Sequence, residues 1–174
     1  DVTGDAGTHI LKEGLLGSSI PMLVQYGDKQ VLVWQEYDGT RQTANSSVLT
    51  YSVYNNGEWS KPTAVYDDGC GDSYADIKVI NDTLALVWQK QTKTITDEEA
   101  ENSETALSTL AANSEIYYAE FDNSTDTFTN IIRITDNEYC DMMPKFVEGT
   151  NDISVAYVRN DDNSFLQTSG NNQI

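Results

Sequence analysis

An internal repeat constrains the fold of this 174-residue chain more than any other feature of its sequence. The apolar string Val-Leu-Val-Trp-Gln at residues 31–35 recurs as Leu-Val-Trp-Gln at 86–89, and a shorter version, Val-Ala-Tyr, occurs at 155–157. Each string contains one aromatic anchor, and an aliphatic residue precedes each anchor by 23 positions. The three pairs are Leu11 with Trp34, Val65 with Trp88, and Ile134 with Tyr157. Self-similarity of this kind indicates a repeat architecture.

Two loops account for the variation in length between the copies. Tyr51 follows Trp34 by 17 positions, whereas Tyr118 follows Trp88 by 30, so the second copy contains a 13-residue insertion. The next turn is two residues longer in the second copy than in the first. The remaining positions align without gaps, which indicates one structural unit repeated along the chain.

Each unit predicts four antiparallel strands. The first is short and apolar, the second is apolar on both faces as expected for a buried strand, and the third is rich in tyrosine and β-branched residues. The Asn56-Gly57 turn favours a tight hairpin into the fourth strand. The predicted strands cover residues 21–26, 31–36, 48–54 and 58–66 in the first copy, 75–80, 84–90, 116–121 and 127–134 in the second, and 153–159 in the third.

Four-stranded repeats of this length are typical of β-propeller blades. Up-and-down barrels and β-sandwiches are the alternatives, but neither requires a repeated frame. We therefore expect an all-β propeller segment of antiparallel blades. Its parts are an outer strand at residues 8–14, whole blades at 18–66 and 72–134, and a partial blade at 141–174.

A resemblance supports this fold. The sequence Tyr-Ser-Val-Tyr-Asn-Asn-Gly-Glu-Trp-Ser-Lys-Pro at residues 51–62, with the Asp-x-x-Pro motif from Asp141 to Pro144, resembles blades of sialidase-like and lectin-like propellers on secreted bacterial proteins. The resemblance covers roughly residues 8–160 and implies an extracellular or cell-surface module that binds carbohydrate. The Asp box of sialidases, Ser-x-Asp-x-Gly-x-Thr-Trp, is absent from the sequence.

The net charge excludes several classes of partner. Ten Lys and Arg residues against 28 Asp and Glu residues give a charge of −18. Such an acidic surface repels phosphate backbones and anionic lipids, so we expect no nucleic-acid partner. No apolar run approaches the ~18 residues of a membrane helix, so we expect no membrane insertion. We expect any signal peptide to have been removed or to lie upstream of residue 1.

Four residues are candidates for ligand binding: Asp72, Asp76, Asp141 and Arg41. Asp72 and Asp141 occupy equivalent positions just before the innermost strands, where a carboxylate accepts backbone hydrogen bonds or reaches a ligand. The loop at residues 67–72 faintly resembles a calcium loop but lacks the spaced ligands and terminal Glu of an EF-hand. We expect no cofactor, with calcium as the alternative.

The two cysteines, Cys70 and Cys140, are expected to form a disulfide. They fall one residue apart in the repeat frame, where neighbouring blades converge. The insertion predicts a short helical segment near residues 96–112, which begins at a capping box at Thr96. It should share one face of the molecule with the links at 67–72 and 136–141. There it either covers a bare edge or forms a wall over a ligand site.

Catalytic constellations are scarce. His9 is the only histidine, which excludes Ser-His-Asp and Cys-His chemistry. Arg41, Arg133 and Arg159 do not repeat, so the arginine cluster that a sialidase needs is not predicted. We therefore expect a non-catalytic module that recognises a glycan or a protein. The alternative is part of a glycoside hydrolase that uses an Asp/Glu pair.

The number of blades predicts further partners. A closed propeller needs at least about four blades, more than these repeats supply. We expect either flanking blades or a homodimer in which two copies complete one ring.

Overall fold

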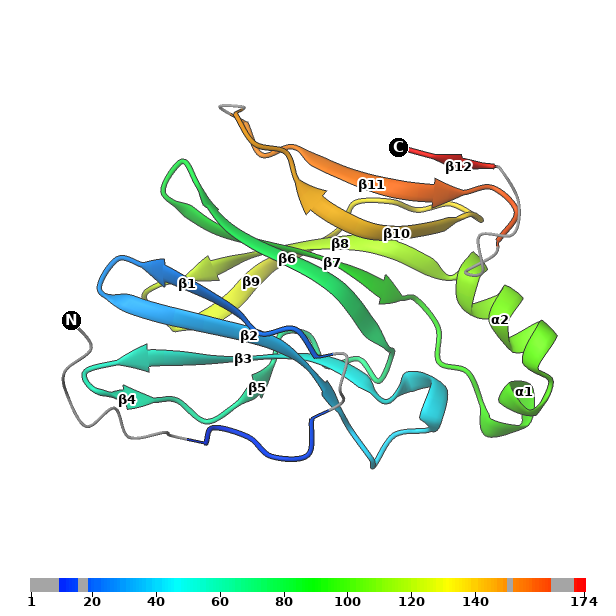
Figure 1. The fold of residues 1–174 in the computed structure, drawn as a ribbon, viewed down its shortest axis with the longest axis horizontal. Coiled ribbons are helices and arrows are strands. Elements are labelled where there is room, and N and C mark those ends of the chain that lie inside the picture. The colour runs from blue at the N-terminus through cyan, green and yellow to red at the C-terminus, as the bar shows by residue number, and fades with distance from the viewer. Residues whose placement is uncertain (1–9, 16–18, 150–151, 164–170) are drawn as a thin grey trace.

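The computed structural model of the chain describes residues 10–15, 19–149, 152–163 and 171–174. Its strands form three separate antiparallel sheets that follow one another along the chain (Figure 1). The all-β prediction is confirmed, and each sheet coincides with one predicted repeat. Among the described residues the sheets close neither into a barrel nor into a ring. No helix in the described part of the chain is long and apolar enough to cross a membrane.

The first sheet contains the strands of the first repeat. β1 (Met22–Tyr26), β2 (Lys29–Tyr37) and β3 (Ser47–Asn55) lie in that order, and a short 3-10 helix, η1 (Thr43–Asn45), connects β2 to β3. Both β4 (Glu58–Trp59) and β5 (Thr63–Ala64) pair with β3. The single fourth strand predicted at 58–66 is thus interrupted, because Pro62 has no N–H to donate to the ladder.

The second and third sheets repeat this order. The second consists of β6 (Asp72–Ile80), β7 (Thr83–Gln91), β8 (Ser114–Asp122) and β9 (Thr127–Arg133). The third consists of β10 (Cys140–Phe146), β11 (Val155–Asn160) and β12 (Asn172–Gln173). Asn160 pairs with Asn172 as Gln91 pairs with Ser114, so β12 occupies the register in which β8 begins.

The aromatic anchors of the second and third sheets face the preceding sheet. Trp88 lies in the apolar core between the first and second sheets, and Tyr157 packs against the core between the second and third. Trp34 is buried on the face of β2 opposite Val31 and Val33, which belong to the core shared with the second sheet. The three anchors occupy the same position on β2, β7 and β11, as the repeat predicts. Trp88 and the half-buried Tyr157 lie between two sheets, whereas no other sheet in the described part of the chain covers Trp34.

Aromatic rings fill the space between the first and second sheets at one end. Tyr51 of β3 meets Phe128 of β9 edge to face, with 5.0 Å between ring centroids, and Phe128 meets Phe121 at 5.4 Å. Edge-to-face pairs of this kind add to the stabilisation from area burial alone. The sheets are therefore joined by an interdigitated core and not only by the chain links.

The insertion forms two short helices, α1 (Asp97–Glu101) and α2 (Ser103–Ala112), at one end of the sheets (Figure 1). The capping box at Thr96 is confirmed: its hydroxyl accepts from the N–H of Glu99, and the Glu99 carboxylate accepts from the N–H of Thr96. Ala106 and Ala111 are the buried residues of α2, and Leu107 is exposed.

The outer strand predicted at residues 8–14 is partly outside the described residues. Its described part, residues 10–14, contains no strand. No neighbouring strand pairs with it among the described residues, so nothing holds its backbone in an extended ladder.

Candidate functional site

The first strands of the second and third sheets each contain a bulge at the same repeat position. The pairing register shifts between Ser73 and Asp76 in β6, and between Met142 and Lys145 in β10. Within the bulges, Tyr74 and Met143 have positive φ angles of 46° and 54°. Residues other than glycine rarely adopt a positive φ angle. Bulges commonly redirect side chains beside functional sites. The bulges direct two large side chains out of their sheets.

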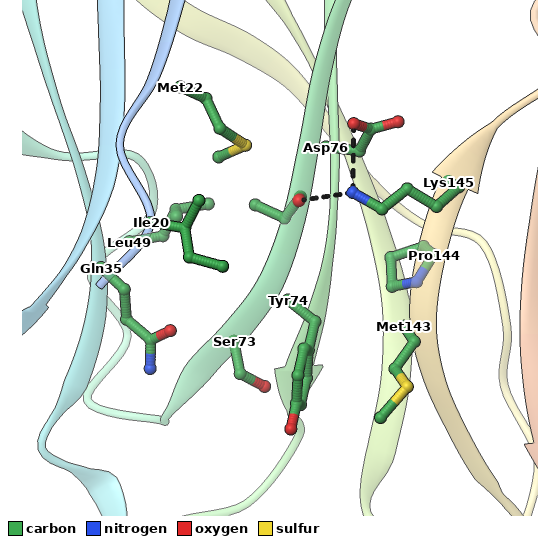
Figure 2. A pocket seen from close by; sticks show the side chains of 11 residues that line it. Ile20, Met22, Gln35, Leu49, Ser73, Tyr74, Asp76, Met143, Pro144 and Lys145 are labelled. Carbon is green, nitrogen blue, oxygen red and sulfur yellow. Dashed lines mark hydrogen bonds and ion pairs between the residues drawn. The ribbon is translucent and has the colours of Figure 1, made fainter. Parts of the chain in front are cut away.

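These side chains line a cavity of about 510 Å³ along the first strands of all three sheets. Figure 2 shows Ile20, which lies just before β1, with Tyr74 of β6 and Met143 of β10 around this space. The three residues are equivalent in the repeat, because Ile20 precedes Trp34 by the same 14 positions that separate Tyr74 from Trp88 and Met143 from Tyr157. We call this cavity the first-strand groove. Its lining is Ile20, Met22, Gln35, Leu49, Ser73, Tyr74, Ala75, Asp76, Met143, Pro144 and Lys145.

One ion pair lies in the wall of the groove. Lys145 Nζ lies 3.2 Å from Asp76 Oδ1, and the other Asp76 oxygen accepts from the N–H of Phe146 at 2.9 Å (Figure 2). Lys145 also donates to the carbonyl of Ala75 at 3.4 Å. Asp76 therefore joins β6 to β10, and it is the one candidate residue from the sequence that the structure places in this groove.

A hydrogen-bond relay that begins at the groove residue Gln35 recurs at the equivalent position of the second sheet. Gln35 donates to the hydroxyl of Ser47 at 2.5 Å, and Ser47 donates to the backbone carbonyl of Asp72. In the next sheet Gln89 donates to Ser114 at 2.7 Å, and Ser114 donates to the carbonyl of Asp141 at 3.1 Å. Each relay connects one sheet to the first strand of the next. Sequence reasoning missed it, although the glutamine after each tryptophan was a visible signal.

Asp72 has a structural role. Its carboxylate accepts from Trp88 Nε1 at 2.9 Å and from the N–H of Leu49 in the first sheet at 3.3 Å. Lys90 Nζ lies 3.1 Å from the same carboxylate and 2.8 Å from Asp68. Burial disfavours the Lys90 ammonium, but the attraction of Asp72 and Asp68 outweighs it and raises the pKa of Lys90. Asp72 lines none of the cavities described here, so its predicted ligand contact is not supported.

Asp141, the equivalent of Asp72, has fewer partners. Its Oδ2 accepts from Asn137 at 2.8 Å, but its Oδ1 is buried without a hydrogen-bond partner. Burial raises the pKa of Asp141; the Asn137 amide acts against this shift and the nearby Glu115 adds to it. Glu115 is itself buried and satisfied by Arg133 at 2.8 Å and Thr135 at 2.5 Å. These two carboxyl groups lie in the interior and not in the groove.

Arg41 stabilises the link between the first and second sheets. It donates to the carbonyl of Cys70 at 3.0 Å and pairs with Asp38 at 3.4 Å and with Asp67. The carboxylates of Asp67, Asp68 and Asp72 in the loop at 67–72 thus form ion pairs with Arg41 or Lys90. Within the described ranges, no group of three or more His, Cys, Asp or Glu side chains could hold a metal ion.

The insertion forms one wall of a second, more polar cavity of about 450 Å³. Ala112 is the last residue of α2, and Thr92, Lys93 and Asn113 lie beside the helices in sequence. The rest of the lining is Arg133, Asn137, Glu138 and Asn163. The insertion also bonds to the first sheet, since Asn45 donates to the carbonyl of Ile95 at 2.8 Å and accepts from its N–H at 3.0 Å. The lining of this cavity includes a single carboxylate, that of Glu138.

The expected disulfide is wrong: Cys70 and Cys140 are both free and buried. They are held in different surroundings, Cys140 against Ala111 and Met142, and Cys70 beside the Asp68–Lys90 pair. Burial raises the pKa of Cys140 to about 12 and also raises that of Cys70. Nearly equivalent positions in the repeat therefore did not bring the two sulfur atoms together.

Comparisons with known proteins assign no family to this chain. The models of known protein families give no match to the chain, and neither do the curated proteins.

Proposed function

We propose that this chain is a segment of a β-propeller from a secreted or cell-surface bacterial protein, and that it binds a glycan without catalysing a reaction. Three antiparallel sheets follow one another along the chain, and the aromatic anchors of the second and third face the sheet before them, which is consistent with successive blades. The first strands would then face the propeller channel, where the groove lies.

The observation that carries the binding proposal is the convergence of Ile20, Tyr74 and Met143 on one groove. Tyr74 and Met143 have positive φ angles, which residues other than glycine rarely adopt, and such backbone strain is concentrated at functional sites. The Tyr74 side chain is exposed although it is large and apolar. A ligand that stacks on this ring would explain why the bulge directs it into the groove.

A sugar fits the chemistry beside Tyr74. Its ring offers a stacking face, while Ser73, Gln35 and Asp76 offer hydroxyl, amide and carboxylate groups along the same wall. Binding sites of this kind combine an apolar surface with a few polar groups that fix orientation. The aliphatic residues Ile20, Met22 and Met143 favour a second candidate, an apolar side chain of a protein ligand.

Screening on a glycan array tests the proposal. We expect fluorescently labelled protein to bind a restricted set of glycans, and Tyr74→Ala to lose that binding. Tyr37→Ala is the matched control, because Tyr37 is also exposed but lies outside the groove. Equal loss in both variants, or no glycan bound by the wild type, would refute a glycan site in the groove.

A glycoside hydrolase is less well supported. Such an enzyme needs two carboxyl groups about 5 to 9.5 Å apart on either side of a bound sugar. The groove is lined by one carboxylate, Asp76, and the second cavity by one, Glu138. Incubation with fluorogenic sialosides and galactosides checks this alternative: turnover that Asp76→Asn abolishes would replace the binding proposal.

A further inference from the structure

The junction between the first and second sheets is closed by one arginine side chain. The Arg41 guanidinium pairs with Asp38 and Asp67. It also donates to the backbone carbonyls of Asn45 and Cys70. Only 11% of the Arg41 side chain is exposed there. Arg41 thus fills the space between the loop that follows β2 and the link to the second sheet.

The repeat places the same four partner positions at the junction of the second and third sheets. Counted from equivalent strand residues, they are Thr92 for Asp38, Ala112 for Asn45, Asp136 for Asp67 and Tyr139 for Cys70. Thr92 and Ala112 line the cavity of about 450 Å³ beside the insertion, and so do the two residues between Asp136 and Tyr139. This second cavity therefore lies where Arg41 lies at the first junction.

The second junction has no counterpart of Arg41. The loop that follows β7, residues 92–113, contains no arginine. Arg133 comes instead from the end of β9, and its guanidinium is held by Glu115 at 2.8 Å and by Asp136 at 2.7 Å. It forms part of the cavity wall and leaves the space beside Thr92 and Ala112 open.

The lining of the second cavity offers oxygen atoms that lack donors. Asn163 Oδ1 is buried and has no hydrogen-bond partner. The Glu138 carboxylate is exposed and forms no ion pair with any described residue. A buried acceptor without a donor is costly, so this lining favours a ligand that donates hydrogen bonds.

The charge around the second cavity favours a cation. Residues 97–104 of the insertion contain five carboxylates, whereas Lys93 is the only cation in residues 92–113. The chain as a whole carries a charge of −18, which attracts cations from a distance. A guanidinium combines a positive charge with five N–H donors in one plane, and it accepts no hydrogen bonds.

We infer that the second cavity binds a guanidinium group supplied by another molecule, either an arginine side chain of a protein or a small guanidino compound. The group donates to Asn163 Oδ1 and pairs with Glu138, in the place that Arg41 occupies at the first junction. The inference does not depend on the glycan proposed for the first-strand groove, because the linings of the two cavities share no residue.

Proton–nitrogen correlation NMR of the full chain, titrated with methylguanidinium, tests the inference. We expect saturable shifts concentrated on the backbone and side-chain amide signals of Asn113, Asn137 and Asn163. N-methylurea is the matched control ligand, since it has a similar shape without the charge, and it should cause little shift. L-arginine and the peptide acetyl-Gly-Arg-Gly-amide should shift the same signals. Tighter binding of the peptide would identify a protein as the source, and tighter binding of L-arginine a small molecule.

Three substitutions of exposed residues determine which charges matter. Glu138→Gln should weaken methylguanidinium binding about threefold, as expected when an exposed ion pair is lost. Lys93→Gln removes the unpaired cation from the lining and should tighten binding about twofold. Lys61→Gln is the matched control: Lys61 is also an exposed lysine but lies outside the cavity, so its removal should leave binding unchanged. The NMR spectrum of each variant shows whether it is folded.

Shifts that do not saturate, or that N-methylurea reproduces, overturn the inference. A Lys93→Gln variant that binds methylguanidinium more weakly than the wild type also overturns it. So does acetate, if it saturates the same signals more tightly than methylguanidinium does, because the second cavity would then be an anion site built on Lys93.

Discussion

The ammonium of Lys90 lies 3.1 Å from Asp72 Oδ1 at the junction of the first and second sheets, where both side chains are completely or almost completely buried. The other Asp72 oxygen accepts from Leu49 in the neighbouring sheet. One carboxylate thus neutralises a buried cation and joins two sheets.

Replacing Asp72 should therefore be severely destabilising. Asp72→Ala leaves Lys90 buried with Asp68 as its remaining partner, and breaking a buried ion pair costs about 3–5 kcal/mol. Urea denaturation followed by tryptophan fluorescence measures the loss. Asp67→Ala is the control: Asp67 pairs with Arg41 but is well exposed, so its removal should cost less than about 1 kcal/mol. Similar losses in the two variants would contradict the role given to Asp72.

Replacing Asp141, in contrast, should increase the stability of the protein. Its pKa is raised by burial, so the folded state disfavours its ionised form. A raised carboxyl pKa means that this group contributes most to stability below its ordinary value of 3.8, and that this contribution is lost as the pH rises through the folded-state pKa. Asn keeps an oxygen for the bond from Asn137 and cannot ionise.

We therefore expect Asp141→Asn to stabilise the protein by about 1 kcal/mol at pH 7. The gain should shrink toward zero below about pH 4, where both states of the wild type are protonated. Denaturation series at several pH values measure it. Asp136→Asn, on the exposed partner of Arg133, serves as the control and should change stability by less than about 0.5 kcal/mol. A loss of stability at pH 7 would show that the Asp141 charge is needed.

The relay serines offer a matched pair of substitutions. Ser114 is completely buried, so Ser114→Ala leaves the Gln89 amide and the Asp141 carbonyl without a partner in the interior. An unsatisfied buried group costs about 1–3 kcal/mol. Ser47 is only partly buried, and water can replace its hydroxyl, so Ser47→Ala should cost less. Thermal denaturation compares the two, and a larger loss at Ser47 would contradict the argument from burial.

The repeated frame predicted the strands well, because burial on alternate faces of successive sheets imposes the same pattern on each copy. Trp34 and Trp88 were correctly assigned one position, and the helix start at Thr96 was correctly located from its capping residues. The interruption between β4 and β5 was not anticipated, although Pro62 was visible in the sequence.

The groove was predicted only through Asp76. Tyr74 and Met143 have no sequence signature of a positive φ, which usually belongs to glycine or asparagine, so their bulges depend on tertiary packing. The roles of Asp72 and Arg41 could not be separated from ligand binding by sequence either. Whether a carboxylate meets a ligand or a buried lysine depends on neighbours that lie in other strands.

The strain at Tyr74 can be tested separately from its proposed ligand. Tyr74→Gly removes both the exposed ring and the steric cost of its φ of 46°. Because that cost is of order 1 kcal/mol, we expect the variant to be as stable as the wild type or slightly more stable. Glycan binding should nevertheless disappear with the ring. A variant destabilised by several kcal/mol would instead make Tyr74 a packing residue.

The free cysteines give the last prediction. A thiol with a pKa of about 12, such as Cys140, is ionised in about one molecule in ten thousand at pH 8, and the thiolate is the reactive form. Cys70 is also buried, and its pKa is raised as well. Iodoacetamide should therefore modify the native protein slowly at both positions, but it should add two groups once urea exposes the thiols, with no reductant present. Mass spectrometry counts the adducts. Unmodified protein in urea, two mass units lighter than the dithiol form, would show that Cys70 and Cys140 are bridged after all.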